Sequence, residues 1–364
     1  MRTKMLLQLA IILLSSRSVC QSQKSIKNVN NIDLTTEMLN SFLVSQMDSL
    51  KIPGLSIAII NNAEVVHHKT FGYANLEKKI PVTKTTIFEA ASMSKSVFAT
   101  FVMTFVEEGK LDLDQPLYQY LPYDDIAYDE RYKQITARIV LSHRSGFPNW
   151  RENEDDKKLK IKFDPGTDYG YSGEAYHYLA MVLKHIENTD WDGLEKAFQE
   201  RIAIPLELEH TTFIEDAYAL KHKAEPYNSD GKWINWKEDY WYKKDKGVFV
   251  APASIRSEPL DFSKWMIGIM NKKILKEESY QELLKPHSTI TTLPSGIKLY
   301  YSLGFMTAGG TYQNSFFHGG SNDGFTSWYM MDVEKKFGYV LFTNSMFGET
   351  LGNILLDYFE KASY

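Results

Sequence analysis

Strand-like segments lie near both ends of this chain, and helical segments with long loops fill the region between them. Near the amino end, the apolar runs at residues 55–60 and 64–71 predict a hairpin. Four further strand-like runs follow, at residues 300–306, 315–317, 326–331 and 339–343. The simplest packing joins the terminal strands in one antiparallel sheet flanked by helices, with a mostly helical insertion over about residues 113–255. The sequence therefore predicts an α+β fold.

Apolar residues recur at helical spacing in several segments that frame this sheet. They include residues 36–50, 135–142, 176–186, 191–202 and 349–359. The chain has 364 residues, of which 43% are hydrophobic and 24% charged, so it is long enough for a sizeable core. We expect one folded domain over residues 35–362, preceded by a flexible segment at residues 21–34.

Residues 1–20 have the pattern of a secretory signal peptide. Arg2 and Lys4 precede an apolar run of about ten residues, which is too short to span a bilayer comfortably. Cys20 is the only cysteine, so no intrachain disulfide is expected. An uncleaved anchor, or a lipid attached to Cys20, is the alternative and would tether the protein to a membrane. We expect a secreted or periplasmic protein, and the net charge of −5 gives no reason to expect nucleic acid.

The sequence Ser92-Met93-Ser94-Lys95 stands just before the apolar helical run at residues 97–103. Ser92 and Lys95 are three residues apart, so in the first turn of a helix their side chains share one face. A serine hydroxyl is a poor nucleophile until a base takes its proton, and a desolvated lysine can be neutral and act as that base. The helix N-terminus favours the negative charge that develops at the serine. The spacing predicts a nucleophile with an amine base.

Two other serine-x-x-lysine sequences occur, at residues 229–232 and 295–298. Both contain a glycine and are typical of turns, where nothing fixes the lysine over the serine. We therefore expect the catalytic pair at Ser92 and not at these two positions.

Tyr171 is a candidate partner for Ser92. It lies in the glycine-containing loop before the helix predicted at residues 176–186. A lysine ammonium beside it would lower its pKa, because the cation favours phenolate, and Tyr171 would then share the serine proton. The alternative is an ordinary packed tyrosine, since the chain has 22 of them.

A third segment, His318-Gly319-Gly320-Ser321, lies on a predicted strand and its exit. Backbone N–H groups at a strand edge can stabilise an oxyanion, and glycines let a substrate approach the backbone closely. His318 would orient the substrate or donate a hydrogen bond to it. The alternative is a strand-end histidine that is satisfied within the protein.

These segments together resemble the penicillin-recognising serine hydrolases, and in particular the class C β-lactamase-like branch with its esterases and D-stereospecific peptidases. The three matching motifs are Ser92-Met93-Ser94-Lys95, Tyr171-Ser172-Gly173 and His318-Gly319-Gly320. Similar supporting stretches occur at residues 53–58, 71–74, 107–114 and 141–148. The resemblance covers about residues 35–362 and implies a β-lactamase/transpeptidase-like fold.

The resemblance implies a mechanism in which Ser92 attacks a carbonyl while Lys95 and Tyr171 transfer the proton. The backbone N–H groups of Ser92 and Ser321 would form the oxyanion hole, and water would release the acyl-enzyme. The substrate-binding positions would be His318, Gly319, Gly320 and Gly173. Which of Lys95 and Tyr171 is the acylation base stays open.

Three departures from the family pattern bear on the substrate. Gly173 stands where the family usually has an asparagine, and His318 where it often has a lysine. Ser254 and Ile255 replace a common glycine pair, so the pocket wall is expected to differ. Because the first two changes remove groups that recognise β-lactams, an esterase or peptidase is favoured over a β-lactamase.

Two further residues are candidate members of the site. His143 resembles the structural histidine that the family has at a helix end, and Asp323, which follows the third motif, would be a contact at the rim of the site.

Two functions remain in competition at this point. The first is an exported serine hydrolase acting on an ester, amide or β-lactam in a small molecule or peptide. The second is a non-catalytic protein that binds a ligand or peptidoglycan on the same scaffold. No cluster of cysteine, histidine and glutamate has metal-ligand spacing, so we expect neither a metal nor another cofactor.

Overall fold

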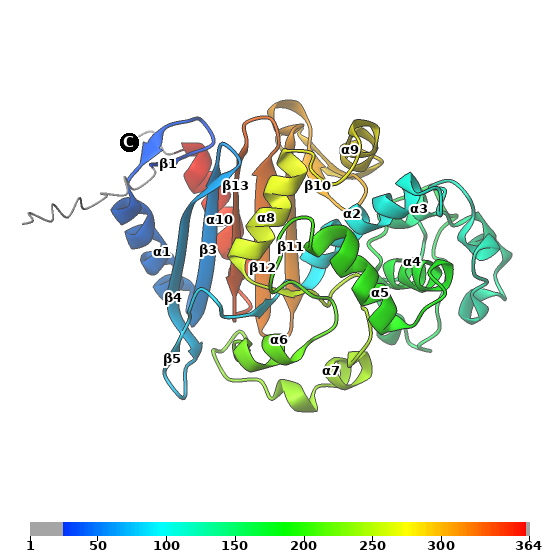
Figure 1. The fold of residues 1–364 in the computed structure, drawn as a ribbon, viewed down its shortest axis with the longest axis horizontal. Helices are drawn as coiled ribbons and strands as arrows, with labels where there is room; N and C mark the ends of the chain where they lie inside the picture. The colour runs from blue at the N-terminus through cyan, green and yellow to red at the C-terminus, as the bar shows by residue number, and fades with distance from the viewer. Residues whose placement is uncertain (1–24, 362–364) are drawn as a thin grey trace, which may run out of the picture.

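The computed structural model of the protein describes residues 25–361. Within them, nine strands form an antiparallel sheet in the order β5-β4-β3-β13-β12-β11-β10-β9-β8 (Figure 1). These strands are β3 Gly54–Asn61, β4 Glu64–Asn75, β5 Ile80–Pro81, β8 Ser288–Thr292, β9 Lys298–Tyr301, β10 Met306–Ala308, β11 Ser315–Asn322, β12 Phe325–Asp332 and β13 Phe337–Thr343. Strand β3 pairs directly with β13, with Ile57 opposite Leu341. The α+β fold, with a sheet built from both ends of the chain, is confirmed.

The helices lie on both faces of the sheet and in a lobe beside it (Figure 1). In the described chain they are α1 Thr36–Leu50, α2 Ser94–Glu107, α3 Ala137–Leu141, α4 Gly173–Ile186, α5 Trp191–Phe198, α6 Ala217–His222, α7 Tyr240–Asp245, α8 Pro259–Met270, α9 Glu277–Leu284 and α10 Gly348–Lys361. Between α2 and the short strand β7 (Arg256–Ser257), the described chain contains helices, turns and loops but no strand. The mostly helical insertion is therefore confirmed.

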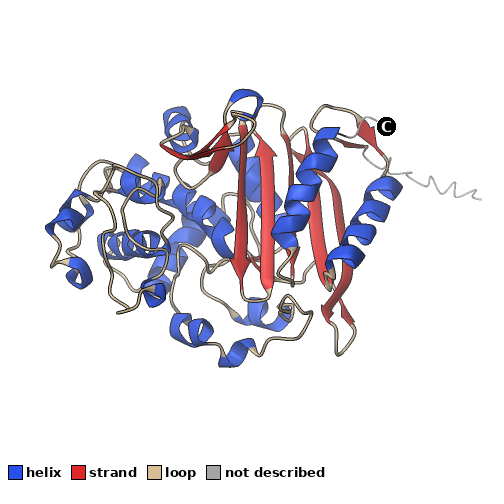
Figure 2. Ribbon diagram, turned by 180° about the vertical axis from the view of Figure 1, so that it is seen from behind, coloured by secondary structure: helices blue, strands red, loops and turns tan. Residues whose placement is uncertain are grey.

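Strand β3 is buried along its whole length because helices cover both faces of the sheet. Leu55, Ile57 and Ile59 pack in one apolar cluster with residues of α1 and α10. Ala58 and Ile60 point the opposite way and belong to the main cluster, which includes residues of α2 and α8. This alternation follows from the two-residue period of a strand. Figure 2 shows the face that α1 and α10 cover, and α8 crosses the other face in Figure 1.

The segment before α1 differs from the sequence prediction. Residues 25–34 are not a flexible tail, because β1 (Ile26–Lys27) pairs with β2 (Asp33–Leu34). Ile26 is only 1% exposed, and the Asn61 side chain accepts a hydrogen bond from Lys27 N and donates one to Lys27 O, both at 2.9 Å. The predicted signal peptide and Cys20 lie outside the described residues. Of the described helices, none has the length and apolar character needed to cross a bilayer.

The apolar run at residues 300–306, predicted as one strand, is instead split between β9 and β10. Gly304 causes the break: its φ is +86°, and Ser302 N donates to Phe305 O across the bend. A Cβ on Gly304 would lie 2.5 Å from the Ala99 Cβ and 2.8 Å from Lys95 O. The bend therefore brings the sheet into contact with α2, the helix that carries Lys95.

Candidate active site

Ser92 lies in a 3₁₀ turn, Ala91–Met93, that runs directly into α2. The sequence predicts Ser92 in the first turn of the helix, and the structure places it in this tighter turn just before. Ala91 has a φ of +47°, a left-handed conformation that is uncommon for a residue with a side chain. Ser327 Oγ donates to Ala90 O at 2.7 Å, so the sheet fixes the backbone that presents the half-buried serine.

Lys95 stands over Ser92, as the three-residue spacing predicts. Its Nζ lies 3.1 Å from Ser92 Oγ and donates to Pro252 O at 2.9 Å. Lys95 is only 1% exposed, and burial lowers its pKa well below the usual lysine value because an ammonium loses its hydration there. The amine therefore favours the neutral form that can accept a proton. The lysines of the other two serine-x-x-lysine sequences, at residues 229–232 and 295–298, are exposed.

The segment that supplies Pro252 replaces the family's glycine pair with side chains that fix its own position. Ser254 Oγ donates to Phe213 O at 2.8 Å and accepts a hydrogen bond from Val250 N at 3.1 Å. Ile255 N donates to Ser94 Oγ at 3.0 Å. This wall of the site is therefore tied to α2 beside the nucleophile.

The structure brings Tyr171 to the same place. Lys95 Nζ lies 4.6 Å from the centre of the Tyr171 ring, and the phenol is hydrogen-bonded with Ser92. The sequence predicts that a lysine ammonium lowers the pKa of Tyr171, and this is wrong. Burial raises the pKa of Tyr171, and the hydrogen bond with Ser92 opposes that rise only in part. Burial therefore favours the neutral phenol of Tyr171.

His143 holds the loop that carries Tyr171. Its Nδ1 accepts a hydrogen bond from Ser172 N at 3.0 Å, and its ring centre lies 4.2 Å from that of Tyr171. His143 is fully buried with a φ of +56°, and Ser172 Oγ donates to Pro148 O at 2.9 Å. The geometry agrees with a structural role for His143 and gives that role a specific target, the backbone next to Tyr171.

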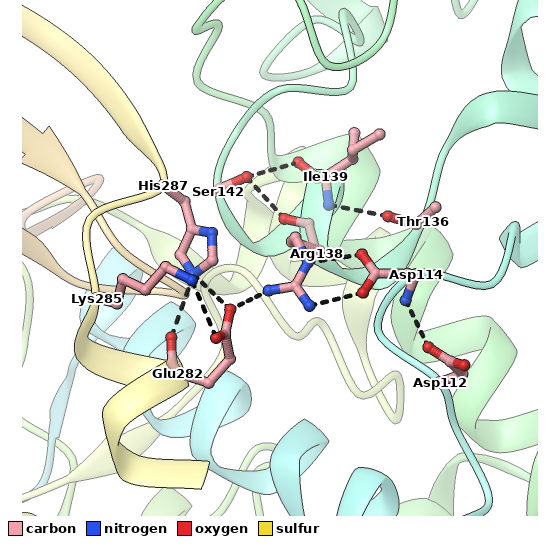
Figure 3. Close-up of polar contacts among 9 residues, drawn as sticks. All are labelled: Asp112, Asp114, Thr136, Arg138, Ile139, Ser142, Glu282, Lys285 and His287. Carbon is pink, nitrogen blue, oxygen red and sulfur yellow. Dashed lines mark hydrogen bonds and ion pairs between the residues drawn. The ribbon is translucent and has the colours of Figure 1, made fainter. Parts of the chain in front are cut away.

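The helix that leads to His143, α3, is fixed in turn by an ion-pair network (Figure 3). Arg138 of α3 makes two bonds of 2.7 Å with the Asp114 carboxylate and a further contact with Glu282 of α9. Glu282 also lies 3.1 Å from His287 and 3.3 Å from Lys285 (Figure 3). These contacts join the helical lobe to the segment before β8, so the position of Tyr171 depends on both halves of the fold.

Strand β11 meets the nucleophile turn at Gly320. A Cβ on Gly320 would lie 2.2 Å from Ala90 O and 3.0 Å from Ser92 N, so only a glycine allows this approach. The Cα of Gly320, where the peptide to Ser321 begins, therefore lies against the backbone of Ser92. Ser321 itself is exposed. Strand β10 pairs only with Phe316 and Phe317 of β11, so among the described residues the later part of β11 is paired on one side alone.

His318 does not point into open space, although the sequence predicts a contact with substrate. It is 3% exposed, its Nε2 accepts from the Tyr301 hydroxyl at 2.9 Å, and its Nδ1 donates to Gly319 O at 2.5 Å. Burial and the nearby Lys95 lower the pKa of His318 to about 3. Both nitrogens of a neutral ring are thus engaged within the protein. Its place is behind Tyr171, with ring centres 6.3 Å apart.

Gly173 also differs from its predicted role as a substrate contact. It is buried at the start of α4, and Asn149 O and Oδ1 both accept its N–H at 3.0 Å. A Cβ there would lie 2.9 Å from Asn149 O and 3.0 Å from the Trp150 ring. Trp150 therefore occupies the space where the family has a side chain. Spacing in the sequence gives no signal for Asn149 or Trp150, so neither residue is predicted at the site.

A model of the beta-lactamase family matches residues 39–358 of the chain. The chain belongs to the beta-lactamase family. This confirms the family that the three motifs resemble. The family member described here is 23% identical over 328 residues to protein flp of Staphylococcus aureus (strain MW2), which is 85% of this chain and 63% of flp. It therefore spans less than two thirds of flp. It is also 24% identical over 304 residues to the putative penicillin-binding protein PbpX of Bacillus subtilis (strain 168), covering 80% of this chain and 70% of PbpX.

Two solved structures have a fold similar to that of this chain. The octameric penicillin-binding protein homologue from Pyrococcus abyssi has a TM-score of 0.70 at 22% identity, over 86% of this chain and 74% of that chain. The D-alanine carboxypeptidase AmpC from Burkholderia cenocepacia has a TM-score of 0.68 at 18% identity, over 85% of this chain and 93% of that chain. At these identities the likeness establishes the β-lactamase/transpeptidase-like fold.

Proposed function

We propose that this protein is an exported serine hydrolase that forms an acyl-enzyme at Ser92. The observation that carries the proposal is the 3.1 Å contact between Ser92 Oγ and Lys95 Nζ in a setting where burial favours the neutral amine. A serine with a neutral amine at hydrogen-bond distance has the nucleophile and base that acyl transfer needs. Export rests on the signal-like sequence of residues 1–20.

In the proposed acylation step, Ser92 Oγ bonds to the substrate carbonyl carbon and its proton passes to Lys95 Nζ. The carbonyl π electrons move onto the oxygen, which the N–H groups of Ser92 and Ser321 stabilise. When the bond to the leaving group breaks, Tyr171 gives that group a proton and regains one from the Lys95 ammonium. Water then attacks the ester carbon, loses a proton to Lys95, and the released Ser92 oxygen takes a proton back.

The substrate we propose is a carboxylic ester or a peptide rather than a β-lactam. Gly173 has no side chain that could bind the acylamide group of a β-lactam, and Trp150 fills the space where such a side chain would lie. The unpaired side of β11 after Phe317 suits an extended substrate that adds along the strand. The name of one similar protein, a D-alanine carboxypeptidase, supports a peptide-like substrate.

A fluorophosphonate probe tests the nucleophile directly. The wild-type protein should be labelled and Ser92→Ala should not, with hydrolysis of p-nitrophenyl acetate lowered by more than about 10³-fold. Ser229→Ala is the matched control, because Ser229 is exposed and also has a lysine three residues later. Equal labelling of wild type and Ser92→Ala would refute the proposal. A panel of p-nitrophenyl esters, D-amino acid amides and nitrocefin then ranks the substrates.

The alternative function, a non-catalytic protein that binds a ligand or peptidoglycan, predicts a different result. Such a protein would bind peptidoglycan fragments but show neither labelling nor turnover.

A further inference from the structure

A cavity of about 430 Å³ opens beside the candidate active site. Ser321 lies in its wall, one residue after the glycine that touches the Ser92 backbone. Ala253 also lines it, and the neighbouring Pro252 O accepts a hydrogen bond from Lys95. The opposite wall comes from the segment that carries α7, which lies along one end of the sheet (Figure 1). A substrate group that extends past Ser321 therefore enters this cavity.

The inner end of the cavity holds two cations and two carboxylates that compensate one another. Lys223 Nζ lies 2.6 Å from Glu89 and 3.4 Å from Glu215, and Arg256 lies 3.6 Å from each of the same carboxylates. Asn322 Nδ2 donates to Glu89 at 2.6 Å. Buried charges of this kind are stable only when paired, so these four fix the floor of the cavity and leave no net charge there.

The outer part of the cavity has an excess of carboxylates. Asp239, Asp245 and Asp323 line it. Among the described residues, Lys246 is the one cation of the lining besides the two in the floor. In the described part of the chain, no hydrogen bond or ion pair involves the side chain of Asp245 or Asp323. Burial raises the pKa of Asp323, and the Asp239 and Glu89 carboxylates raise it further, so these charges act on a common space.

Aromatic rings complete the same walls. Trp150 and Trp241 lie with ring centres 5.4 Å apart, and Trp236 and Tyr242 meet edge to face at 4.6 Å. Aromatic faces together with carboxylates attract organic cations, and they offer little to an anion. Trp150 is also the residue that covers Gly173, so this wall is continuous with the second motif.

We propose that this cavity is a subsite for a cationic group of the substrate, an ammonium carried near the carbonyl that Ser92 attacks. The inference rests on the proposed function and narrows its substrates to amine-bearing esters or peptides. The carboxylates of Asp245 and Asp323 supply the charge, and Trp150 supplies a face against which the alkyl part of the cation packs. The other two tryptophans already hold cations of the protein, because Lys223 lies 4.2 Å from the ring centre of Trp236 and Lys244 lies 4.8 Å from that of Trp241.

Two isosteric esters test the proposal. The p-nitrophenyl ester of 4-(trimethylammonio)butyrate carries a permanent cation, and that of 5,5-dimethylhexanoate replaces the nitrogen with carbon. We expect the wild-type kcat/KM for the cationic ester to exceed that for the neutral ester by about tenfold. Asp245→Asn and Asp323→Asn should each lower this ratio by about three- to fivefold. The matched control is Glu238→Gln, because Glu238 is an exposed carboxylate just before α7 that lies outside the cavity lining and should leave the ratio unchanged.

A binding measurement separates this proposal from the proposed function. The anilides of the same two acids are titrated into Ser92→Ala by calorimetry, where we expect the cationic compound to bind about tenfold more tightly. Equal binding of the two anilides, or a ratio that neither asparagine variant changes, would overturn the cation subsite. Turnover that persists in Ser92→Ala would overturn the proposed function, while the binding result would still decide the subsite.

Discussion

The contact between Gly320 and the nucleophile turn gives a quantitative prediction for Gly320→Ala. The added Cβ would lie 2.2 Å from Ala90 O, 2.6 Å from Ser327 Oγ and 3.0 Å from Ser92 N. Approaches below 3.0 Å are essentially never seen for a real Cβ, and two of the three atoms belong to backbone that cannot rotate away. Strand β11 must therefore move from the turn by about 1 Å, and a displacement of that size in a reacting group costs about 10²-fold in rate.

The same displacement moves the peptide of Ser321 away from the carbonyl oxygen of the substrate. Loss of one oxyanion donor lowers kcat by about 10²–10³-fold, so we expect Gly320→Ala to fall in this range. Overpacking should also lower the free energy of unfolding by about 1–3 kcal/mol. Steady-state hydrolysis of p-nitrophenyl acetate and urea unfolding measure the two effects.

Gly309→Ala is the control for Gly320→Ala. A Cβ at Gly309 has its nearest neighbour at 3.5 Å, an ordinary contact, so this variant should keep both rate and stability. A Gly320→Ala enzyme with kcat within about threefold of wild type would refute the reasoning, because the strand would then not need the close approach that the structure shows.

Three buried ionisable groups give further predictions. Lys95 must be neutral to accept a proton, and burial lowers its pKa. We therefore expect kcat/KM to fall through one ionisation as the pH decreases below the usual lysine range, and Lys95→Met to abolish activity. A pH profile of kcat/KM without this fall would contradict the role of Lys95. Burial alone would raise the pKa of Glu89, but Arg256 and Lys223 lower it from 4.5 to about 2. The stability that ionised Glu89 gives the fold is therefore complete above about pH 4.5 and is lost as the pH falls toward 2. Glu89→Gln should lower the free energy of unfolding at pH 7 by about 3 kcal/mol and by less at pH 3, as measured by urea unfolding. His318→Phe leaves a buried hydroxyl and carbonyl without their partner, so it should cost about 1–3 kcal/mol and lower turnover of cationic and neutral esters by the same factor; unequal factors would indicate a contact with substrate.

The fold could be predicted from the sequence as far as local periodicity reaches. Strand β3 appears at its predicted place because it is buried on both faces, so its sequence is a short, nearly continuous apolar run. Strand β11 was predicted only to residue 317 but extends to Asn322, since Gly319 and Gly320 have low strand propensity. Gly320 is required by the contact with the nucleophile turn, and Gly319 lies against the Glu349 side chain of α10. Both are tertiary requirements that no local pattern contains. The pairing of β1 with β2 could not be predicted for the same reason, because it depends on the hydrogen bonds that the Asn61 side chain makes with the backbone of Lys27.

The candidate site divides in the same way. The pair Ser92 and Lys95 follows from spacing within one turn. Tyr171 is a candidate from its loop, but only the family resemblance singles it out among the 22 tyrosines. His318 and Gly173, predicted as substrate contacts, lie against Tyr301 and Trp150. No spacing in the sequence links either pair. The charged floor of the cavity comes from separate chain segments that carry no shared motif, so only the assembled structure reveals it.

The pairing of β3 with β13 also sets the order in which a growing chain becomes able to react. Ile57 is synthesised long before Leu341, its partner across the sheet, and closing so long a loop is entropically costly and slow. The turn that carries Ser92 contacts Gly320 and Ser327, which are synthesised more than 200 residues after it. A nascent or truncated chain that lacks them has a serine and a lysine but no opposing strand. The turn that carries Ser92 can therefore take up its final position only after β11 and β12 have been synthesised.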